Sequence, residues 1–342
     1  MGLLSGVSSF FGLDISSNAI RVVQLRGNAL VKYGHIPLDS NVVLSDSKAD
    51  QQKIARAIKD LVEQAGILTK DVAVGLPSNK VFTSVVDIER LSPAELNKTI
   101  MYQADSLIPT PVSESKLDWV VLGDSPKEAD KVEVLLSSVP NEFTEARLEM
   151  LESIGLNVIS FEPDSIALTR SLTAPDNPLP TMIVDIGGRS TDIVITMNGA
   201  PRLIRSIPTG TDAIVRSAAQ NLNIDDNQAQ QFVFKFGISK DKLEGQVYNA
   251  IIGTVDLLVG DIDKSIKFFL GRYQGTNIDR VIVSGGASVL PEFPLYLANK
   301  FGLNIEIGNA WRNIAFPSNR QDELIAISNS FAVSAGLAER AE

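Results

Sequence analysis

Two stretches of the sequence place an aspartate at the end of an apolar segment, with glycine or small polar residues directly after it. One is GLDISSNAIRVVQL, residues 12–25, and the other is IVDIGGRSTDIVI, residues 183–195. Backbone N–H groups in such turns form a nest for phosphate oxygens, and glycine lets a ligand approach closely. Carboxylates repel phosphate but hold Mg²⁺, usually through its water, and the metal then bridges to phosphate. The two stretches predict a clamp on a nucleotide tail, with Asp14 and Asp185 as magnesium positions.

A third turn, VSGGAS at residues 283–288, also follows an apolar strand pattern. Without bulky side chains, it suits a base or ribose that lies flat on the backbone. A single turn of any of these kinds is commonly just a polar β-turn with a glycine kink. Because two matched turns occur together with a third, the sequence favours a ligand site.

The surroundings of the two aspartates repeat. Residues 10–37 and 181–208 both predict strand, aspartate-containing turn, strand, turn and strand, with Asp14 aligned with Asp185. A repeat of this length predicts duplicated lobes. We expect the first lobe at residues 1–180 and the second at 181–342, with a helical subdomain at about 213–274 in the second.

A separate unit interrupts the first lobe. Ser92, Pro93 and Glu95 form a helix start of the capping-box type. Two strand patterns across a polar loop and a second amphipathic helix follow. We expect an inserted αββα subdomain at about 91–156.

Composition excludes several kinds of chemistry. The chain of 342 residues has no cysteine, so disulfides and thiolate metal sites are impossible. Its one histidine, His35, lies in a predicted turn, which leaves little room for histidine-dependent catalysis. A net charge of −10 argues against non-specific nucleic-acid binding. No apolar run approaches the roughly 18 residues of a membrane span, and the apolar N-terminus lacks the basic residues of a signal peptide.

The three turns, in this order, resemble the phosphate and adenosine loops of the actin-like ATPase superfamily. The order, the spacing and the long insertion most resemble the PilM family of type IV pilus assembly proteins, with the cell-division protein FtsA second. The resemblance covers roughly residues 10 to 340. It implies an α/β fold: the actin-like, ribonuclease H-like duplicated two-lobed fold with an inserted αββα subdomain.

The resemblance also implies roles for individual residues. ATP or ADP with Mg²⁺ would bind between the lobes, and Glu162 or Asp164 would orient the attacking water or the metal. The nucleotide-binding positions implied by the resemblance are Asp14, Ser16, Ser17 and Asn18 in the first loop, Asp185, Gly187, Gly188, Arg189, Ser190 and Thr191 in the second, Gly210 and Asp212 beside the ribose and phosphates, and Ser284, Gly285 and Gly286 at the adenosine.

Three positions depart from the family pattern. Ser16 replaces a glycine, which would strain the backbone if the position needs a positive φ. Gln230 and Val233 stand where a ribose-binding glutamate and a lysine near the base are usual. Gln230 still offers hydrogen bonds, whereas Val233 does not. We therefore expect reduced nucleotide affinity and slow or absent hydrolysis.

The resemblance implies a cytoplasmic ATP-binding adaptor of type IV pilus assembly, recruited to the inner face of the membrane by a partner. That partner would be a PilN-like membrane-anchored protein whose N-terminal peptide enters a groove between residues 91–156 and the first lobe. The neighbourhood of this groove is expected to include Met101, Leu107, Ile108 and Trp119, although each is also a candidate for the core of the insertion. The alternatives are an FtsA-like filament-forming scaffold, which would make the chain a homo-oligomer, and a sugar or acid kinase of the same fold.

Overall fold

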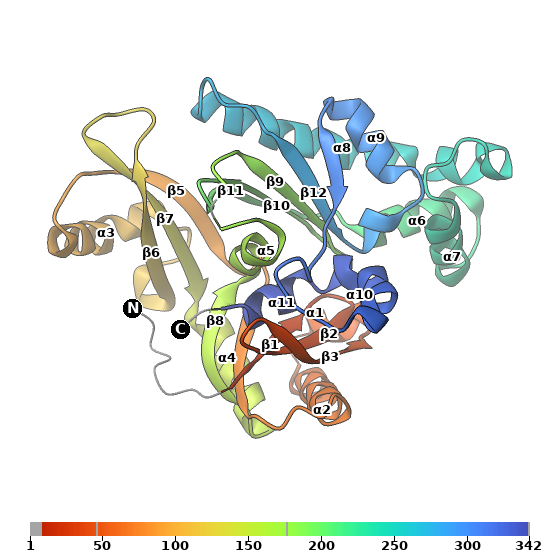
Figure 1. Cartoon of the computed structure of the whole chain (residues 1–342), viewed down its shortest axis with the longest axis horizontal. Helices are drawn as coiled ribbons and strands as arrows, with labels where there is room; N and C mark the ends of the chain where they lie inside the picture. Colours follow the sequence, from red (N-terminus) through yellow and green to blue (C-terminus); the bar gives the residue numbers. More distant parts are fainter. Residues whose placement is uncertain (1–8, 46, 176, 341–342) are drawn as a thin grey trace.

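The computed structural model describes residues 9–45, 47–175 and 177–340. Two five-stranded sheets form the centres of two lobes, and a smaller three-stranded sheet lies to one side (Figure 1). The first lobe has the strand order β3-β2-β1-β4-β8. Its strands are β1 (Phe11–Ile15), β2 (Ala19–Arg26), β3 (Ala29–Pro37), β4 (Asp71–Leu76) and β8 (Asn157–Pro163).

The second lobe repeats this topology in the order β11-β10-β9-β12-β13. In both sheets three strands form an antiparallel meander. A fourth strand pairs in parallel with the first strand of the meander, and a fifth pairs in parallel with the fourth. The actin-like α/β fold expected from the sequence is confirmed. The strands are β9 (Thr181–Ile186), β10 (Thr191–Met197), β11 (Ala200–Ile207), β12 (Arg280–Gly285) and β13 (Asn304–Ile307).

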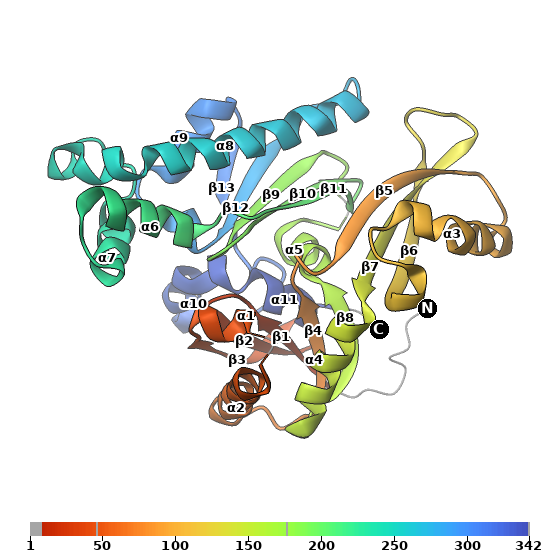
Figure 2. The same ribbon diagram turned by 180° about the vertical axis from the view of Figure 1, so that it is seen from behind.

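Helices with one apolar face cover the outer faces of both sheets. In α2, Ile54, Ile58 and Leu61 recur at helical spacing and pack on the first sheet with Leu151 of α4. Figure 2 shows α2 and α4 on the outer side of this sheet. The helices are α1 (Ser40–Leu44), α2 (Lys48–Gln64), α3 (Pro93–Leu107), α4 (Asn141–Ser153), α5 (Asp164–Leu172), α6 (Thr211–Leu222), α7 (Asp226–Phe236), α8 (Gln246–Arg272), α9 (Phe293–Phe301), α10 (Gln321–Ile327) and α11 (Ala332–Ala338). Short 3₁₀ turns are η1 (Val112–Glu114), η2 (Lys242–Gly245), η3 (Gly286–Val289), η4 (Ser318–Arg320) and η5 (Ser328–Ser330).

Between the two sheets lie α5 and α11, which share one apolar cluster with strands of both lobes (Figure 1). Leu168 and Leu337 are fully buried there beside Val23 of the first sheet and Ile183 of the second. Although α11 belongs to the expected second lobe at residues 181–342, it packs on β1 and β2 of the first. The chain therefore returns to its first lobe at its C-terminal end.

The inserted unit has different limits from those expected. Its sheet has the order β5-β7-β6, so it begins with β5 (Phe82–Glu89), before residue 91. It continues with β6 (Ser115–Asp124) and β7 (Lys131–Pro140), and α3 packs on one face of this sheet. The capping box at Ser92 and Glu95 is present. However, α4 packs on α2 and β8 of the first lobe, so the unit is a helix on a three-stranded sheet rather than αββα.

Close packing of α11 on α5 depends on Gly336. A Cβ at this position would collide with the carbonyl oxygen of Ala167. We expect Gly336→Ala to lower the free energy of unfolding by about 1–3 kcal/mol, the usual cost of overpacking a core. Gly260→Ala is the matched control, because it lies in α8 with open space around it and should stabilise by roughly 0.5–1 kcal/mol. Urea unfolding measures both, and equal midpoints for the two variants would contradict this packing.

Candidate functional site

The two aspartate-containing turns meet between the lobes. A Cβ on Gly188 would lie 2.8 Å from Ser17 Oγ and 3.4 Å from Asn18 Nδ2 of the first turn. It would lie 3.3 Å from Asp212 Oδ1 at the start of α6. Gly188 therefore leaves a narrow space where three segments from two lobes converge.

Backbone N–H groups in both turns are free to bind an anion. Within the described chain, the N–H groups of Ser17, Asn18, Gly188, Arg189 and Ser190 make no hydrogen bond to backbone, whereas those of Ser16 and Gly187 donate to the carbonyl oxygens of Ala19 and Ser190. Several free N–H groups in one turn form an anion-binding concavity. The two turns thus supply the kind of nest that phosphate oxygens need.

The second turn is held in place by the start of α6. The N–H groups of Thr211 and Asp212 donate to the carbonyl oxygens of Gly187 and Gly188 at 2.9 and 2.8 Å. A Cβ at Gly210 would lie 2.5 Å from both of these oxygens, so this approach requires glycine. Consequently the second turn and the N-terminus of α6 form one rigid unit.

Ser16 is not strained. Neither Ser16 nor the aligned Gly187 has a positive φ, so the expected backbone cost does not arise. Instead, Ser16 Oγ donates to Asp14 Oδ2 at 2.8 Å and accepts from Arg21 Nη1 at 2.8 Å. The serine side chain therefore links the aspartate of the first turn to a cation.

Arg21, which the sequence analysis missed, lies directly opposite Asp14 in the β1–β2 hairpin, with Nη1 3.3 Å from Asp14 Oδ2. Burial raises the pKa of Asp14, although Arg21 and Ser16 oppose the rise. In the second lobe the same position holds Asp192, opposite Asp185. Arg21 and Asp192 each follow their aspartate by seven positions, and this shared spacing is the sequence feature from which they could have been predicted.

Asp185 has a strongly altered acidity. Burial raises its pKa to about 7, and the charges of Asp192 and Asp14 add to the rise against a hydrogen bond from Ser284. Ser284 Oγ donates to Asp185 Oδ1 at 2.6 Å. Ser284, expected at the adenosine, therefore holds a carboxylate, and the adenosine role expected for Gly285 and Gly286 stays a prediction.

Asp164 and Glu162 have different surroundings. Burial and the charges of Asp14, Asp192 and Asp185 place the pKa of Asp164 well above its usual value, and its Oδ1 has no hydrogen-bond partner in the described chain. Glu162 accepts two bonds from Arg170, at 2.7 and 3.0 Å, and one from Arg340 at 2.6 Å. Glu162 is thus held in ion pairs, whereas Asp164 belongs with the aspartates Asp14, Asp185 and Asp192.

The other predicted residues of the second turn, Arg189, Ser190 and Thr191, make polar contacts around it. Arg189 reaches across the cleft, with Nη2 3.3 Å from Ser40 Oγ of α1, and its Nε is 3.8 Å from Asp212. Thr191 Oγ1 donates to the Thr209 carbonyl at 2.7 Å, while Ser190 ends the second turn by accepting from the N–H of Gly187. These contacts keep the second turn closed.

The two residues of α7 that depart from the family pattern differ in their exposure to solvent. Val233 is fully buried in the core of the second lobe, whereas Gln230 is exposed. The structure therefore gives Val233 a packing role, and Gln230 remains free to hydrogen-bond.

A magnesium ion fits the oxygen-only donor set of Asp14, Asp164 and Asp185. Within the described residues, no three acidic or histidine side chains are close enough to hold a metal directly. Coordination through water, with the unpartnered Asp164 Oδ1 as one acceptor, is consistent with both observations.

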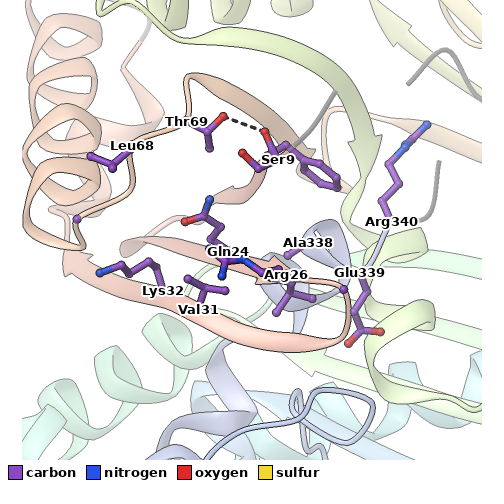
Figure 3. A pocket seen from close by; sticks show the side chains of 14 residues that line it. Ser9, Gln24, Arg26, Val31, Lys32, Leu68, Thr69, Ala338, Glu339 and Arg340 are labelled. Carbon is purple, nitrogen blue, oxygen red and sulfur yellow. Dashed lines mark hydrogen bonds between the residues drawn. The ribbon is translucent and has the colours of Figure 1, made fainter. Parts of the chain in front are cut away.

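Two further hollows lie away from the turns. A pocket of about 680 Å³ lies at the opposite end of β2, beside Gln24, Lys32 and Thr69, and Thr69 donates to the Ser9 carbonyl at 2.8 Å (Figure 3). Its lining includes none of Asp14, Asp164 and Asp185. The other, called here the groove, measures about 760 Å³. It lies between the inserted sheet and the first lobe, and its lining residues include Leu76, Val81, Lys116, Trp119, Val120, Val139, Leu148 and Ile166.

Of the four residues expected near this groove, only Trp119 lines it, and its side chain also packs against the apolar cluster under α3. Leu107 and Ile108 pack with the core under α3, and Met101 is half-exposed on α3. The reason is that α3 covers the opposite face of the inserted sheet from the groove. None of the described helices is long and apolar enough to span a bilayer.

Comparison with known proteins identifies the family. The model of the type IV pilus assembly protein PilM matches residues 12–342. The chain belongs to this PilM family. A chain in a solved PilM–PilN type IV pilus biogenesis complex is 25% identical to it with a TM-score of 0.82, and the match covers 96% of this chain and 97% of the other.

More distant relatives agree. FtsA from Pseudomonas aeruginosa is 26% identical over 267 residues, which cover 68% of this chain and 62% of that protein. The chain spans less than two thirds of the length of the curated FtsA relatives it matches. MreB5 of Spiroplasma citri, solved with AMPPNP, is 13% identical with a TM-score of 0.54 over 96% of this chain and 95% of the other, which shows the shared fold. The expectation from the sequence, a PilM-like protein with FtsA as the second resemblance, is confirmed.

The raised pKa of Asp185 predicts how stability depends on pH. In the unfolded chain an aspartate ionises near its ordinary pKa of about 3.9, and in the folded chain Asp185 ionises at about 7. Between these values only the folded state holds the proton, so the free energy of unfolding falls as pH rises through this window. In metal-free buffer, Asp185→Asn should be more stable than wild type by about 1–3 kcal/mol at pH 8, at about 1.4 kcal/mol per pKa unit, with little difference at pH 4.

Urea unfolding across this pH range measures the effect. Asp60→Asn, an exposed change on α2, should track wild type. A constant difference between Asp185→Asn and wild type at all pH values would argue against a buried, protonated Asp185.

Proposed function

We propose that this PilM-family protein binds ATP or ADP between its lobes, with the phosphates on the two turns. The observation that carries the proposal is the convergence of free N–H groups from Ser17, Asn18, Gly188 and Arg189 on one narrow space. The adenosine would lie on the backbone of Gly285 and Gly286. In support, MreB5 has been solved with AMPPNP and with ADP, and it shares the fold.

Magnesium would be held by Asp14 and Asp185 through water, with Asp164 beside them. When bound, the ion neutralises phosphate charge. Arg21 would supply a second, metal-independent cation at the first turn, because its guanidinium already lies 2.8 Å from Ser16 Oγ. With Glu162 held by two arginines, only Asp164 remains to orient water, which is consistent with slow or absent hydrolysis.

Two substitutions separate these contributions. Arg21→Met should weaken ATP binding by roughly ten- to a hundredfold both with and without Mg²⁺, because it removes a charge-assisted contact worth about 1.5–3 kcal/mol. Asp185→Ala should weaken binding by a similar factor with Mg²⁺ and leave metal-free binding unchanged or stronger. Calorimetric titration with ATP and ADP, with EDTA or Mg²⁺, provides the measurement. Wild-type affinity in both variants under both conditions would place the nucleotide elsewhere.

We further propose that the groove docks the N-terminal peptide of a PilN-like, membrane-anchored partner. Support comes from its apolar lining by Leu76, Val139 and Leu148 and from the similarity to a PilM found in a PilM–PilN complex. The rim adds Lys116 and Glu145, which offer charged contacts for a polar peptide end. Through this peptide the protein would be brought to the inner face of the membrane as an assembly adaptor.

Neighbouring residues of β6 provide a matched test of the groove. Val120 is 53% exposed and lines the groove, whereas Val121 is 47% exposed and does not. Val120→Asp should weaken binding of a synthetic PilN N-terminal peptide by roughly tenfold, since a carboxylate would be desolvated against an apolar ligand. Val121→Asp should bind nearly normally. Fluorescence anisotropy measures both, and equal affinities would move the peptide site away from this face of the sheet.

A further inference from the structure

A third hollow lies between the inserted sheet and the second lobe. It measures about 510 Å³, within the usual size of a small-molecule site. Its lining comes from β5 and β7 of the inserted sheet and from β11 and α8 of the second lobe, and β5 runs beside β11 (Figure 2). Among the described residues, four cationic side chains and no acidic one line it. This hollow is called here the cationic pocket, after Arg202, Arg205, Lys264 and Arg272.

Arg202 is the buried cation of this pocket. It is 6% exposed, and its Nη2 donates to the Leu122 carbonyl at 3.0 Å. Its Nε lies 3.4 Å from Glu133 Oε2 without forming a hydrogen bond, and its Nη1 has no hydrogen-bond partner in the described chain. Buried polar groups are normally satisfied by protein, by water or by a bound ion. Arg202 therefore has unused donors for acceptor oxygens.

The charges around the pocket do not cancel. Three acidic groups contact the four cations: Glu133 pairs with Arg202 and Arg272, Asp87 with Arg272, and Asp261 with Lys264. Arg205 forms no ion pair in the described chain, and its Nη1 donates to Ser265 Oγ at 3.4 Å. One positive charge thus remains, in a chain whose net charge is −10. A bound anion would balance this local excess.

The rest of the lining provides two other kinds of contact. The hydroxyl groups of Thr83 and Ser84 are neutral hydrogen-bonding groups beside the cations. Val85 and Leu135 supply aliphatic side chains, and Phe268 of α8 is an aromatic side chain that is 68% exposed. The pocket therefore has room for oxyanion contacts on one part of its lining and for an apolar group on another.

We propose that the cationic pocket binds a small, soluble organic phosphate, in which a phosphate group is attached to an aromatic or aliphatic body. The guanidinium fork of arginine matches phosphate oxygens, and several cations suit a doubly charged phosphate better than a single carboxylate. Arg202 and Arg205 contact the phosphate, and Phe268 covers the apolar body. No residue of the two aspartate-containing turns lines this pocket, so the inference stands independently of the nucleotide site.

Three probes test the chemistry of the site: phenyl phosphate, inorganic phosphate and phenol. NMR titration of the full chain, without Mg²⁺ or nucleotide, measures their affinities. Phenyl phosphate should bind roughly tenfold more tightly than inorganic phosphate, because its ring adds contact with Phe268. Phenol has the ring without the phosphate and should not compete. Wild-type protein that does not bind phenyl phosphate, or that binds phenol equally well, overturns the inference.

Two lysines of α8 provide a matched pair of variants. Both are exposed and paired with an aspartate of the same helix, but Lys264 lines the pocket and Lys267 does not. Lys264→Met should weaken phenyl phosphate binding by about threefold, the scale of an exposed ion pair. Lys267→Met should keep the wild-type affinity. If the two variants bind equally well, the phosphate does not lie in this pocket.

Arg205→Met should have the larger effect, roughly tenfold, because it removes a charge-assisted contact. Its side chain is exposed and forms no ion pair, so the variant should fold normally. Arg21→Met, which removes the cation of the first aspartate turn, should leave phenyl phosphate binding unchanged. Wild-type affinity in Arg205→Met overturns the inference, and loss of binding in Arg21→Met alone would place the phosphate in the cleft between the lobes.

A lipid headgroup is another source of the same phosphate chemistry. Vesicles of phosphatidic acid in phosphatidylcholine test it by competition with phenyl phosphate. We expect no displacement, because the pocket lies between the inserted sheet and α8. Displacement by these vesicles, and not by pure phosphatidylcholine, would overturn the assignment to a soluble ligand.

Discussion

The rest of the cleft depends on one constraint, the close grouping of four aspartates that are shielded from water. They are Asp14, Asp164, Asp185 and Asp192. Burial raises the pKa of all four, and the charges of neighbouring aspartates add to the rise at Asp164 and Asp185. Such a group is tolerable only if protons or a cation offset it. Arg21 supplies one fixed cation, and a metal-bound nucleotide would supply the rest. Under the proposed function, binding of Mg²⁺ would relieve this repulsion.

The scaffold holds this group by using the same device twice. Each lobe begins with a hairpin whose first strand ends in an aspartate, and the residue opposite is seven positions later. In the first lobe that residue is Arg21 and in the second it is Asp192. The duplication thus produced similar backbones with unequal charges opposite the two aspartates.

Local features were predictable from the sequence because they depend on near neighbours. The hairpins follow from alternation and turn residues, and α3 follows from its capping box. Arg21 and Asp192 were missed because their role depends on cross-strand register. Glu162 and Asp164 were not distinguished, because the chain changes from strand to helix between them and turns their side chains to different sides. The amphipathic pattern of α4 shows that it must pack, but not on which sheet.

The return of α11 to β1 has a consequence for biosynthesis. At Gly12 of β1, where a Cβ would collide with the Ser334 carbonyl oxygen, the first sheet packs against α11, more than 300 positions later in the chain. A ribosome releases the N-terminal strands long before this covering helix exists, so the first sheet must wait with one apolar face open. Contacts of such high sequence separation fold slowly and leave intermediates prone to aggregation. The lobe that is made first is thus not complete until α11 has been made.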